Sequence, residues 1–203
     1  GLGDGVVNVI SNAPADAAAI VERLIANPAV RRVNFTGSTH VGRIVGELSA
    51  RHLKPALLEL GGKAPFLVFD DADLDAAING AVAASLINTG QDCTAATRAI
   101  VARPLYDDFV AGVAELMGKI VVGDPHDPDT DLGPLITPAH RAKVAAMVER
   151  APGEGGRIVT GGTAPDGPGS FYRPTLIADV DERSEVYRSE IFGPVLTVRA
   201  FTD

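Results

Sequence analysis

Apolar positions along the chain alternate between short runs that are typical of buried strands and longer stretches with helical spacing. Short runs bounded by glycine, proline or polar residues predict strands at residues 5–10, 30–35, 55–60 and 65–69. Helical spacing at residues 15–26 predicts a first helix, and Ser38 and Thr39 predict the N-terminal cap of a second. This alternation of strands and helices indicates an α/β fold.

The later part of the chain continues the alternation with more turns. Asp70, Asp71 and Asp73 precede a long apolar stretch, and acidic residues favour the N-terminal end of a helix. Further helices are predicted around Phe109–Ile120 and at 138–150, and further strands at 99–102, 158–159 and 194–201. The glycine pair Gly61-Gly62 breaks the composition, which predicts two domains, at residues 1–60 and 61–203.

Composition and charge exclude several classes of protein. Of the 203 residues, 46% are hydrophobic, so a substantial core is expected. A net charge of -8 argues against a nucleic-acid partner, and no apolar run approaches the roughly 18 residues of a membrane span. A single cysteine cannot form an internal disulfide, which favours a cytoplasmic protein. Because the chain starts at Gly1 and stops after a strand-like run, we expect it to be an internal piece of a longer protein.

A metal site is not predicted. Asp127, Asp129 and Asp131 have the alternation of a calcium loop. However, Leu132 stands where the loop needs glycine, and Pro138 stands where it needs glutamate. The four histidines also lack the spacing of zinc ligands, and the cysteine has no second cysteine beside it.

Cys93, the only cysteine, is a candidate nucleophile. Gly90 before it permits a tight turn, and the small residues Thr94–Ala96 after it predict the start of a helix. A helix N-terminus favours the thiolate, and its free N–H groups can hold an oxyanion. The neighbouring Asp92 opposes thiolate formation unless its side chain points away. The alternative is a small buried apolar residue.

Glu59 is a candidate general base, because it lies in an apolar strand that ends in Gly61-Gly62. Apolar surroundings raise a carboxylate pKa toward neutrality, which suits a base. The alternatives are a buried glutamate paired with Lys54, Lys63 or an arginine, and a glutamate exposed at the strand end.

Two further segments are candidates for binding. Residues 35–42 run from a strand through Gly37 into a capped helix, where N–H groups and the helix dipole can meet a pyrophosphate. Gly37 and Gly42 are five residues apart, so the dinucleotide fingerprint is absent and an ordinary turn is the alternative. Residues 190–195 place a glutamate and an aromatic ring beside a Gly-Pro turn.

Taken in order, these segments resemble the NAD(P)-dependent aldehyde dehydrogenase family over essentially the whole chain. Four motifs carry the resemblance: Phe35-Thr36-Gly37-Ser38-Thr39, Glu59-Leu60-Gly61-Gly62-Lys63, Asn88-Thr89-Gly90-Gln91-Asp92-Cys93 and Glu190-Ile191-Phe192-Gly193-Pro194-Val195. Asp131-Leu132-Gly133-Pro134-Leu135 is also similar to the family.

The resemblance implies a reaction. Cys93 would attack an aldehyde to give a thiohemiacetal, with the oxyanion held by the Cys93 N–H and by an asparagine that lies outside this chain. Hydride would pass to NAD or NADP and leave a thioester, and Glu59 would activate the water that hydrolyses it.

The resemblance also implies the cofactor contacts and the domains. The cofactor-binding residues would be Thr36, Gly37, Ser38, Gly42, Leu60, Glu190 and Phe192. Residues 1–60 would be the second part of a Rossmann-type cofactor domain, and residues 61–203 would form most of the α/β catalytic domain. A homo-oligomer is expected, although the family's oligomerisation strand lies outside this chain.

The substrate and the reaction class stay open. Residues 51–65 look most like enzymes for aromatic aldehydes such as salicylaldehyde, benzaldehyde and vanillin, whereas residues 90–95 look like aminoaldehyde enzymes. We favour the aromatic aldehydes. A thiol esterase that needs no cofactor and a non-catalytic domain are the alternatives from other classes.

Overall fold

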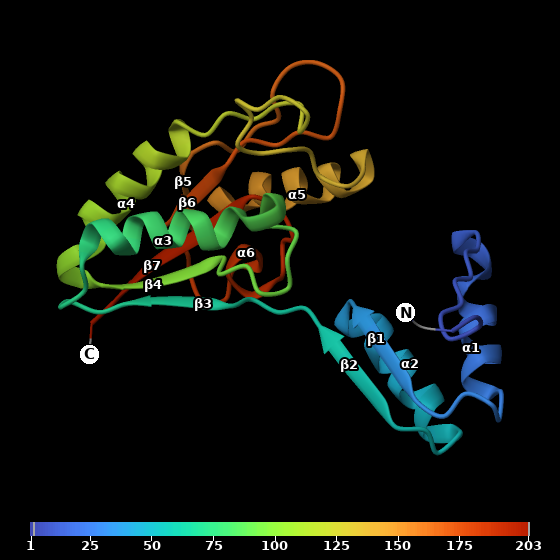
Figure 1. Ribbon diagram of the computed structural model, residues 1–203. Helices are drawn as coiled ribbons and strands as arrows, with labels where there is room; N and C mark the ends of the chain where they lie inside the picture. Colours follow the sequence, from blue (N-terminus) through green and yellow to red (C-terminus); the bar gives the residue numbers. More distant parts are fainter. Residues whose placement is uncertain (2, 203) are drawn as a thin grey trace. The chain divides into compact units, whose positions relative to one another are not determined.

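The computed structural model describes residue 1 and residues 3–202. The chain divides into two compact units, Gly1–Gly61 and Gly62–Asp203, so the division falls between the two glycines of the Gly61-Gly62 pair (Figure 1). Each unit has a sheet of its own. None of the helices that the described residues form is long and apolar enough to cross a membrane.

The first unit is built around two parallel strands. Its elements are η1 (Pro14–Asp16), α1 (Ala17–Ala26), β1 (Val33–Gly37), α2 (Thr39–Arg51) and β2 (Ala56–Leu60). Strands β1 and β2 pair in parallel, and α2 connects them. Ser38 is the N-cap of α2, because its Oγ accepts a hydrogen bond of 3.3 Å from the Val41 N–H. The predicted cap at this position is therefore confirmed, with Thr39 as the first helical residue.

The predicted strand at residues 5–10 is wrong. These residues form a turn and irregular backbone, and their side chains are exposed, with Val9 at 90%. A strand is stable only when its backbone N–H and C=O groups pair with a neighbour. Among the described residues, β1 and β2 pair only with each other, so this apolar run has no strand to join.

The second unit has a five-stranded sheet in the order β3-β4-β7-β6-β5 (Figure 1). The strands are β3 (Pro65–Val68), β4 (Arg98–Ala102), β5 (Arg157–Thr160), β6 (Thr175–Ala178) and β7 (Val195–Phe201). The first four in this order are parallel, and β5 is antiparallel to β6 at one edge. The sequence pattern missed β6, whose four residues lie between a glycine-rich turn and Asp179. The α/β fold is confirmed.

Helices cover both faces of this sheet. The principal ones are α3 (Leu74–Leu86), α4 (Arg103–Gly118), α5 (Pro138–Arg150) and α6 (Glu185–Arg188). Helices α3 and α4 pack with β4, β6 and β7 in one core cluster, and α5 and α6 form a second cluster on the other face. Leu196 and Val198 enter the first cluster and Val195 the second, so β7 is buried on both faces.

In the first unit, α2 packs very closely against β2 at Gly42. A Cβ added to Gly42 would lie 2.5 Å from Leu60 Cδ2, whereas one added to Gly46 on the same helix would lie 3.4 Å from Leu58 Cδ1. The helix can reach this distance from the strand only because position 42 has no side chain.

Gly42→Ala and Gly46→Ala therefore form a matched pair on α2. We expect Gly46→Ala to raise the free energy of unfolding by about 0.5–1 kcal/mol, because alanine loses less backbone entropy in a helix. We expect Gly42→Ala to lower it by about 1–3 kcal/mol, because the new methyl group must displace Leu60. Denaturant titration measures both values. A Gly42→Ala chain as stable as Gly46→Ala would contradict the close packing.

Candidate functional site

Two segments that carry candidate residues meet at the amino edge of the second unit's sheet. Cys93 lies before β4, and Glu190 and Phe192 lie before β7. Because β4 and β7 are adjacent and parallel, with Arg98 opposite Thr197, the segments that precede them reach the same edge. The structure thus brings the cysteine loop and the Glu190–Phe192 turn together.

The loop before Cys93 has an unusual backbone. Asn88, Thr89 and Gly90 follow one another in the left-handed region, with φ of 48°, 59° and 69°. Glycine and asparagine tolerate this conformation, but a β-branched threonine is strained there. Such strain costs about 1–3 kcal/mol per residue and persists only where the surroundings hold it.

Three contacts hold the loop. The Gln91 Oε1 accepts a hydrogen bond of 2.8 Å from the Ile136 N–H, and Thr89 Oγ1 donates one of 3.4 Å to the Gly133 carbonyl. Gly90 packs so closely on the turn at residues 192–194 that an added Cβ would lie 2.1 Å from the Gly193 carbonyl oxygen. The loop is therefore fixed between residues 133–136 and the turn at residues 192–194.

Cys93 itself is exposed, so the alternative of a buried apolar residue is wrong. The predicted helix after Cys93 is also wrong, because residues 92–94 form a single turn and the chain then enters β4. The Ala96 N–H donates to the Ala84 carbonyl of α3 at 3.1 Å, which directs the chain toward the sheet. A helix dipole therefore does not act on this thiol.

Asp92 turns its carboxylate onto Thr94. Its Oδ1 accepts hydrogen bonds from the Thr94 hydroxyl and, at 2.7 Å, from the Thr94 backbone N–H. These two hydrogen bonds hold the pKa of Asp92 below its ordinary value. The side chain thus stabilises the turn that contains Cys93.

A group of charged side chains lies at the same edge of the sheet, and only Glu190 among them was predicted to be a site residue. Lys63 is buried just before β3, Arg98 begins β4, and Glu190 precedes β7. Lys63 Nζ, Arg98 Nε and Glu190 Oε1 are buried and have no hydrogen-bond partner among the described residues. Burial, together with the positive charge of Arg98, lowers the pKa of Lys63 to about 7, and the Glu190 carboxylate opposes the shift.

Gln91 and His140 were also missed as positioning residues. The Gln91 side chain makes its shorter contact through its oxygen, which accepts from the Ile136 N–H at 2.8 Å, whereas its Nε2 lies 3.4 Å from the Asn88 carbonyl oxygen. His140 had been considered only as a metal ligand, yet its Nε2 lies 2.6 Å from the Phe192 carbonyl oxygen. Both contacts join segments about 50 residues apart. Gln91 lies inside one of the motifs, whereas His140 lies outside all of them, so no sequence signal pointed to His140.

In the first unit, the candidate residues gather at the carboxyl ends of β1 and β2. Thr36 lies opposite Glu59 and Gly37 opposite Leu60, and Ser38 follows directly as the cap of α2. The Glu59 side chain is exposed on β2, so the alternative of a glutamate exposed at the strand end holds within this unit.

An apolar groove of about 580 Å³ runs beside α2 in the same unit. It is lined by Pro14, Ala17, Ala18, Val21, Glu22, Phe35, Val41, Ile44, Val45, Leu48 and Arg51. The groove thus lies between α1 and α2 and includes Val41, which donates its N–H to the Ser38 cap. The sequence pattern gave no indication of it, since the apolar residues of both helices were expected to be core.

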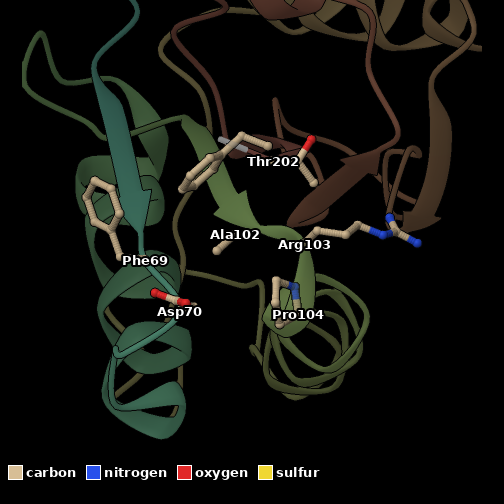
Figure 2. Close-up of a pocket in the computed structure, with 7 residues that line it drawn as sticks. Phe69, Asp70, Ala102, Arg103, Pro104 and Thr202 are labelled. Carbon is tan, nitrogen blue, oxygen red and sulfur yellow. The ribbon is translucent and has the colours of Figure 1, made fainter.

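The second unit has a separate cavity of about 270 Å³ at the carboxyl edge of its sheet (Figure 2). Phe69 and Phe201 meet there edge to face with their ring centroids 5.7 Å apart, and Asp70, Arg103 and Thr202 are the polar residues of its lining. Cys93 and Glu190 precede strands and this cavity follows them, so it lies at the opposite edge of the sheet. None of the predicted site residues lines it.

Replacement of Lys63 by methionine tests the buried charge. The folded protein has a Lys63 pKa of about 7, against 10.5 for an exposed lysine, so between these values the unfolded chain binds more protons. The penalty of burying the charged amine is present in full below the lower pKa and is lost as the pH rises toward the higher one. The free energy of unfolding should therefore rise with pH across this window in the unaltered chain.

In Lys63→Met this rise should be smaller, because the titrating amine is gone. Urea titrations at about pH 7 and about pH 9.5 measure the difference. Lys143→Met, at an exposed lysine of α5, is the control and should keep the rise of the unaltered chain. If the free energy of unfolding rises equally with pH in Lys63→Met and in the unaltered chain, the lowered pKa of Lys63 is contradicted.

The chain is similar to known proteins over nearly its whole length. The model of the aldehyde dehydrogenase family matches residues 1–203. The chain is 59% identical over 198 residues to a vanillin dehydrogenase of Pseudomonas fluorescens, covering 98% of this chain and 40% of that protein. It is 44% identical over 202 residues to a succinate-semialdehyde dehydrogenase of Paenarthrobacter nicotinovorans, covering 100% and 44%.

Solved structures give the same result. The NAD+ complex of an aldehyde dehydrogenase from Bacillus cereus superposes with a TM-score of 0.87 at 35% identity, covering 92% of this chain and 37% of that one. The chain belongs to the aldehyde dehydrogenase family. It spans about two fifths of the length of the curated relatives it matches.

Proposed function

We propose that the protein oxidises an aldehyde to its carboxylic acid with NAD or NADP as hydride acceptor and Cys93 as nucleophile. The observation that carries the proposal is the geometry around Cys93 at the amino edge of the second unit's sheet. There an exposed thiol follows a strained loop that is locked against the Phe192–Pro194 turn. Strain that the surroundings hold in place is a feature of functional sites.

In the proposed reaction the Cys93 thiolate adds to the aldehyde carbon and forms a thiohemiacetal. The cofactor, when bound, would accept the hydride that leaves this carbon. Loss of the hydride converts the thiohemiacetal into a thioester on Cys93. Glu59 takes a proton from water, the resulting hydroxide attacks the thioester, and the acid leaves with the thiol restored. The sum is aldehyde, water and oxidised cofactor giving acid, reduced cofactor and one proton.

The residues present fit a dinucleotide. The turn at Thr36, Gly37 and Ser38 leads into the N-terminus of α2, where unpaired N–H groups favour a pyrophosphate. The apolar groove beside α2 has the size and character for a flat aromatic ring such as adenine. Gly42 and Leu60 support this end of the helix by their close packing.

The second unit offers contacts for the nicotinamide end. We propose that Glu190 accepts hydrogen bonds from the ribose hydroxyls, since its side chain is only half-buried and part of it stays open to a ligand. We propose that the Phe192 ring, which is 36% exposed, packs against the same ribose.

Cys93→Ala is expected to abolish both aldehyde oxidation and the hydrolysis of an activated aryl ester without cofactor. Both activities need the thiolate, whereas the exposed side chain contributes little to stability. Absorbance assays of NADH formation and of ester hydrolysis measure the two activities, and a thermal melt of the variant is the control. Ester hydrolysis without aldehyde oxidation would favour a thiol esterase, activity unchanged in the variant would exclude Cys93 as the nucleophile, and absence of both activities in the unaltered protein would leave a non-catalytic domain.

Glu59→Gln is expected to slow the steady-state rate by about 100- to 10,000-fold, because the water loses its base. The first turnover should persist as a burst of NADH, since acylation of Cys93 precedes the step that needs Glu59. A rapid-mixing experiment with aldehyde and NAD measures the burst. Loss of the burst together with the steady-state rate would show that Glu59 acts before the thioester forms.

An aromatic aldehyde is the proposed substrate, because the chain is 59% identical to a vanillin dehydrogenase and 44% identical to a succinate-semialdehyde dehydrogenase. We expect kcat/KM for vanillin or salicylaldehyde to exceed that for succinate semialdehyde by at least about tenfold, as a difference in pocket contacts can supply. An aminoaldehyde tested in the same assay covers the alternative suggested by Asp92. A preference for either aliphatic aldehyde would contradict the proposal.

A further inference from the structure

Phe192 is held in a conformation that a bulky residue rarely adopts. Its φ is +58°, in the left-handed region, where a side chain crowds its own backbone. Ile191 before it is buried at 1% exposure, so the strain cannot relax by moving that neighbour. Something must hold the Phe192 peptide in place.

His140 supplies that contact. Its Nε2 lies 2.6 Å from the Phe192 carbonyl oxygen, and the two rings meet edge to face with centroids 6.1 Å apart. A carbonyl oxygen can only accept, so Nε2 must carry the proton. Either the neutral ring with its proton on Nε2 or the charged ring can therefore make this bond.

The helix that carries His140 is itself fixed at this end. His140 lies in the first turn of α5, and its backbone N–H donates to the Thr137 Oγ1 cap at 3.1 Å. The preceding Ile136 N–H is the group that holds Gln91. The start of α5 therefore holds the cysteine loop through Gln91 and the Phe192 turn through His140.

The other side of the turn is closed by packing. A Cβ added to Gly193 would lie 2.9 Å from Val144 Cγ2 of α5, and the Gly193 carbonyl rests against Gly90. Phe192 is thus fixed by His140 at its carbonyl, while the residue after it is wedged between α5 and the loop before Cys93.

We propose that His140 is a positioning residue for the nicotinamide cofactor, which acts by holding Phe192, and with it the turn that begins at Glu190, in the orientation that meets the ribose. The inference rests on the proposed function, because Phe192 and Glu190 are assigned to the ribose there. His140 touches neither the reacting thiol nor the aldehyde in this assignment, so its loss should affect the cofactor and spare the chemistry of Cys93.

The test is His140→Ala in the protein that contains this chain. We expect the KM for NAD, and its Kd by calorimetry, to rise about tenfold, as the loss of one well-aligned hydrogen bond would cause. The KM for the aldehyde and the rate of ester hydrolysis without cofactor should stay within about twofold, since both depend on Cys93.

Three further variants separate positioning from general stability. His140→Gln can donate from its amide to the same carbonyl and should restore the NAD affinity. His126→Ala, at a histidine in the exposed turn before α5, should leave every constant unchanged. In a Phe192→Gly background the strain is absent, so His140→Ala should there weaken NAD binding by clearly less than tenfold.

Four results would overturn the inference. An unchanged NAD affinity in His140→Ala would by itself overturn the inference. So would an equal loss of NAD affinity from His140→Ala in the unaltered protein and in the Phe192→Gly background. A loss of ester hydrolysis and a lowered melting temperature in His140→Ala would assign the residue to stability. If the unaltered protein binds neither NAD nor NADP, the proposed function and this inference fail together.

Discussion

The parallel pairing of β4 with β7 is the interaction on which the site depends. These strands are about 100 residues apart in sequence, and their register is secured where the Thr197 N–H and Oγ1 both donate to the Thr97 carbonyl at 3.1 Å. Thr197 is fully buried, so these hydrogen bonds are shielded from water. A shift of this register would separate the cysteine loop from the Glu190–Phe192 turn, because each is tied to the start of its own strand.

Given the pairing of β4 with β7, glycine at two positions allows the cysteine loop and the turn at residues 192–194 to lie in contact. Gly90 adopts a left-handed φ and lies against the Gly193 carbonyl, and Gly193 lies against Val144 of α5. A side chain at either position would push one of these segments away. The strained residues Thr89 and Phe192 each lie next to one of these glycines, and the hydrogen bonds of Gln91 and His140 hold their segments in place.

The sequence predicted the elements that are stabilised by contacts within the element itself. It did not predict those whose conformation depends on a partner far away in the sequence. The helix at 138–150 is confirmed with its bounds, since the Thr137 cap, Pro138 and the apolar spacing all act within the helix. Residues 5–10 and 94–96 have patterns typical of a strand and a helix. Among the described residues the first segment has no strand to pair with, and in the second the Ala96 N–H donates to the Ala84 carbonyl of α3. The motifs named Cys93, Glu190 and Phe192, but the contacts of His140 and Lys63 depend on packing that no local pattern records.

Hydride transfer needs the carbon on Cys93 and the nicotinamide ring to be held at a fixed short distance. In the proposed function both sets of contacts belong to the second unit, with the thiol on the loop before β4 and the ribose contacts on the turn before β7. The segment at the start of α5 is hydrogen-bonded to both, through Ile136 to the loop and through His140 to the turn, so it links the two. Under the proposed function, the strained residues Thr89 and Phe192 would flank the reacting groups for this reason: a relaxed loop would lie farther from the turn, and the thiol would lose its fixed distance from the cofactor.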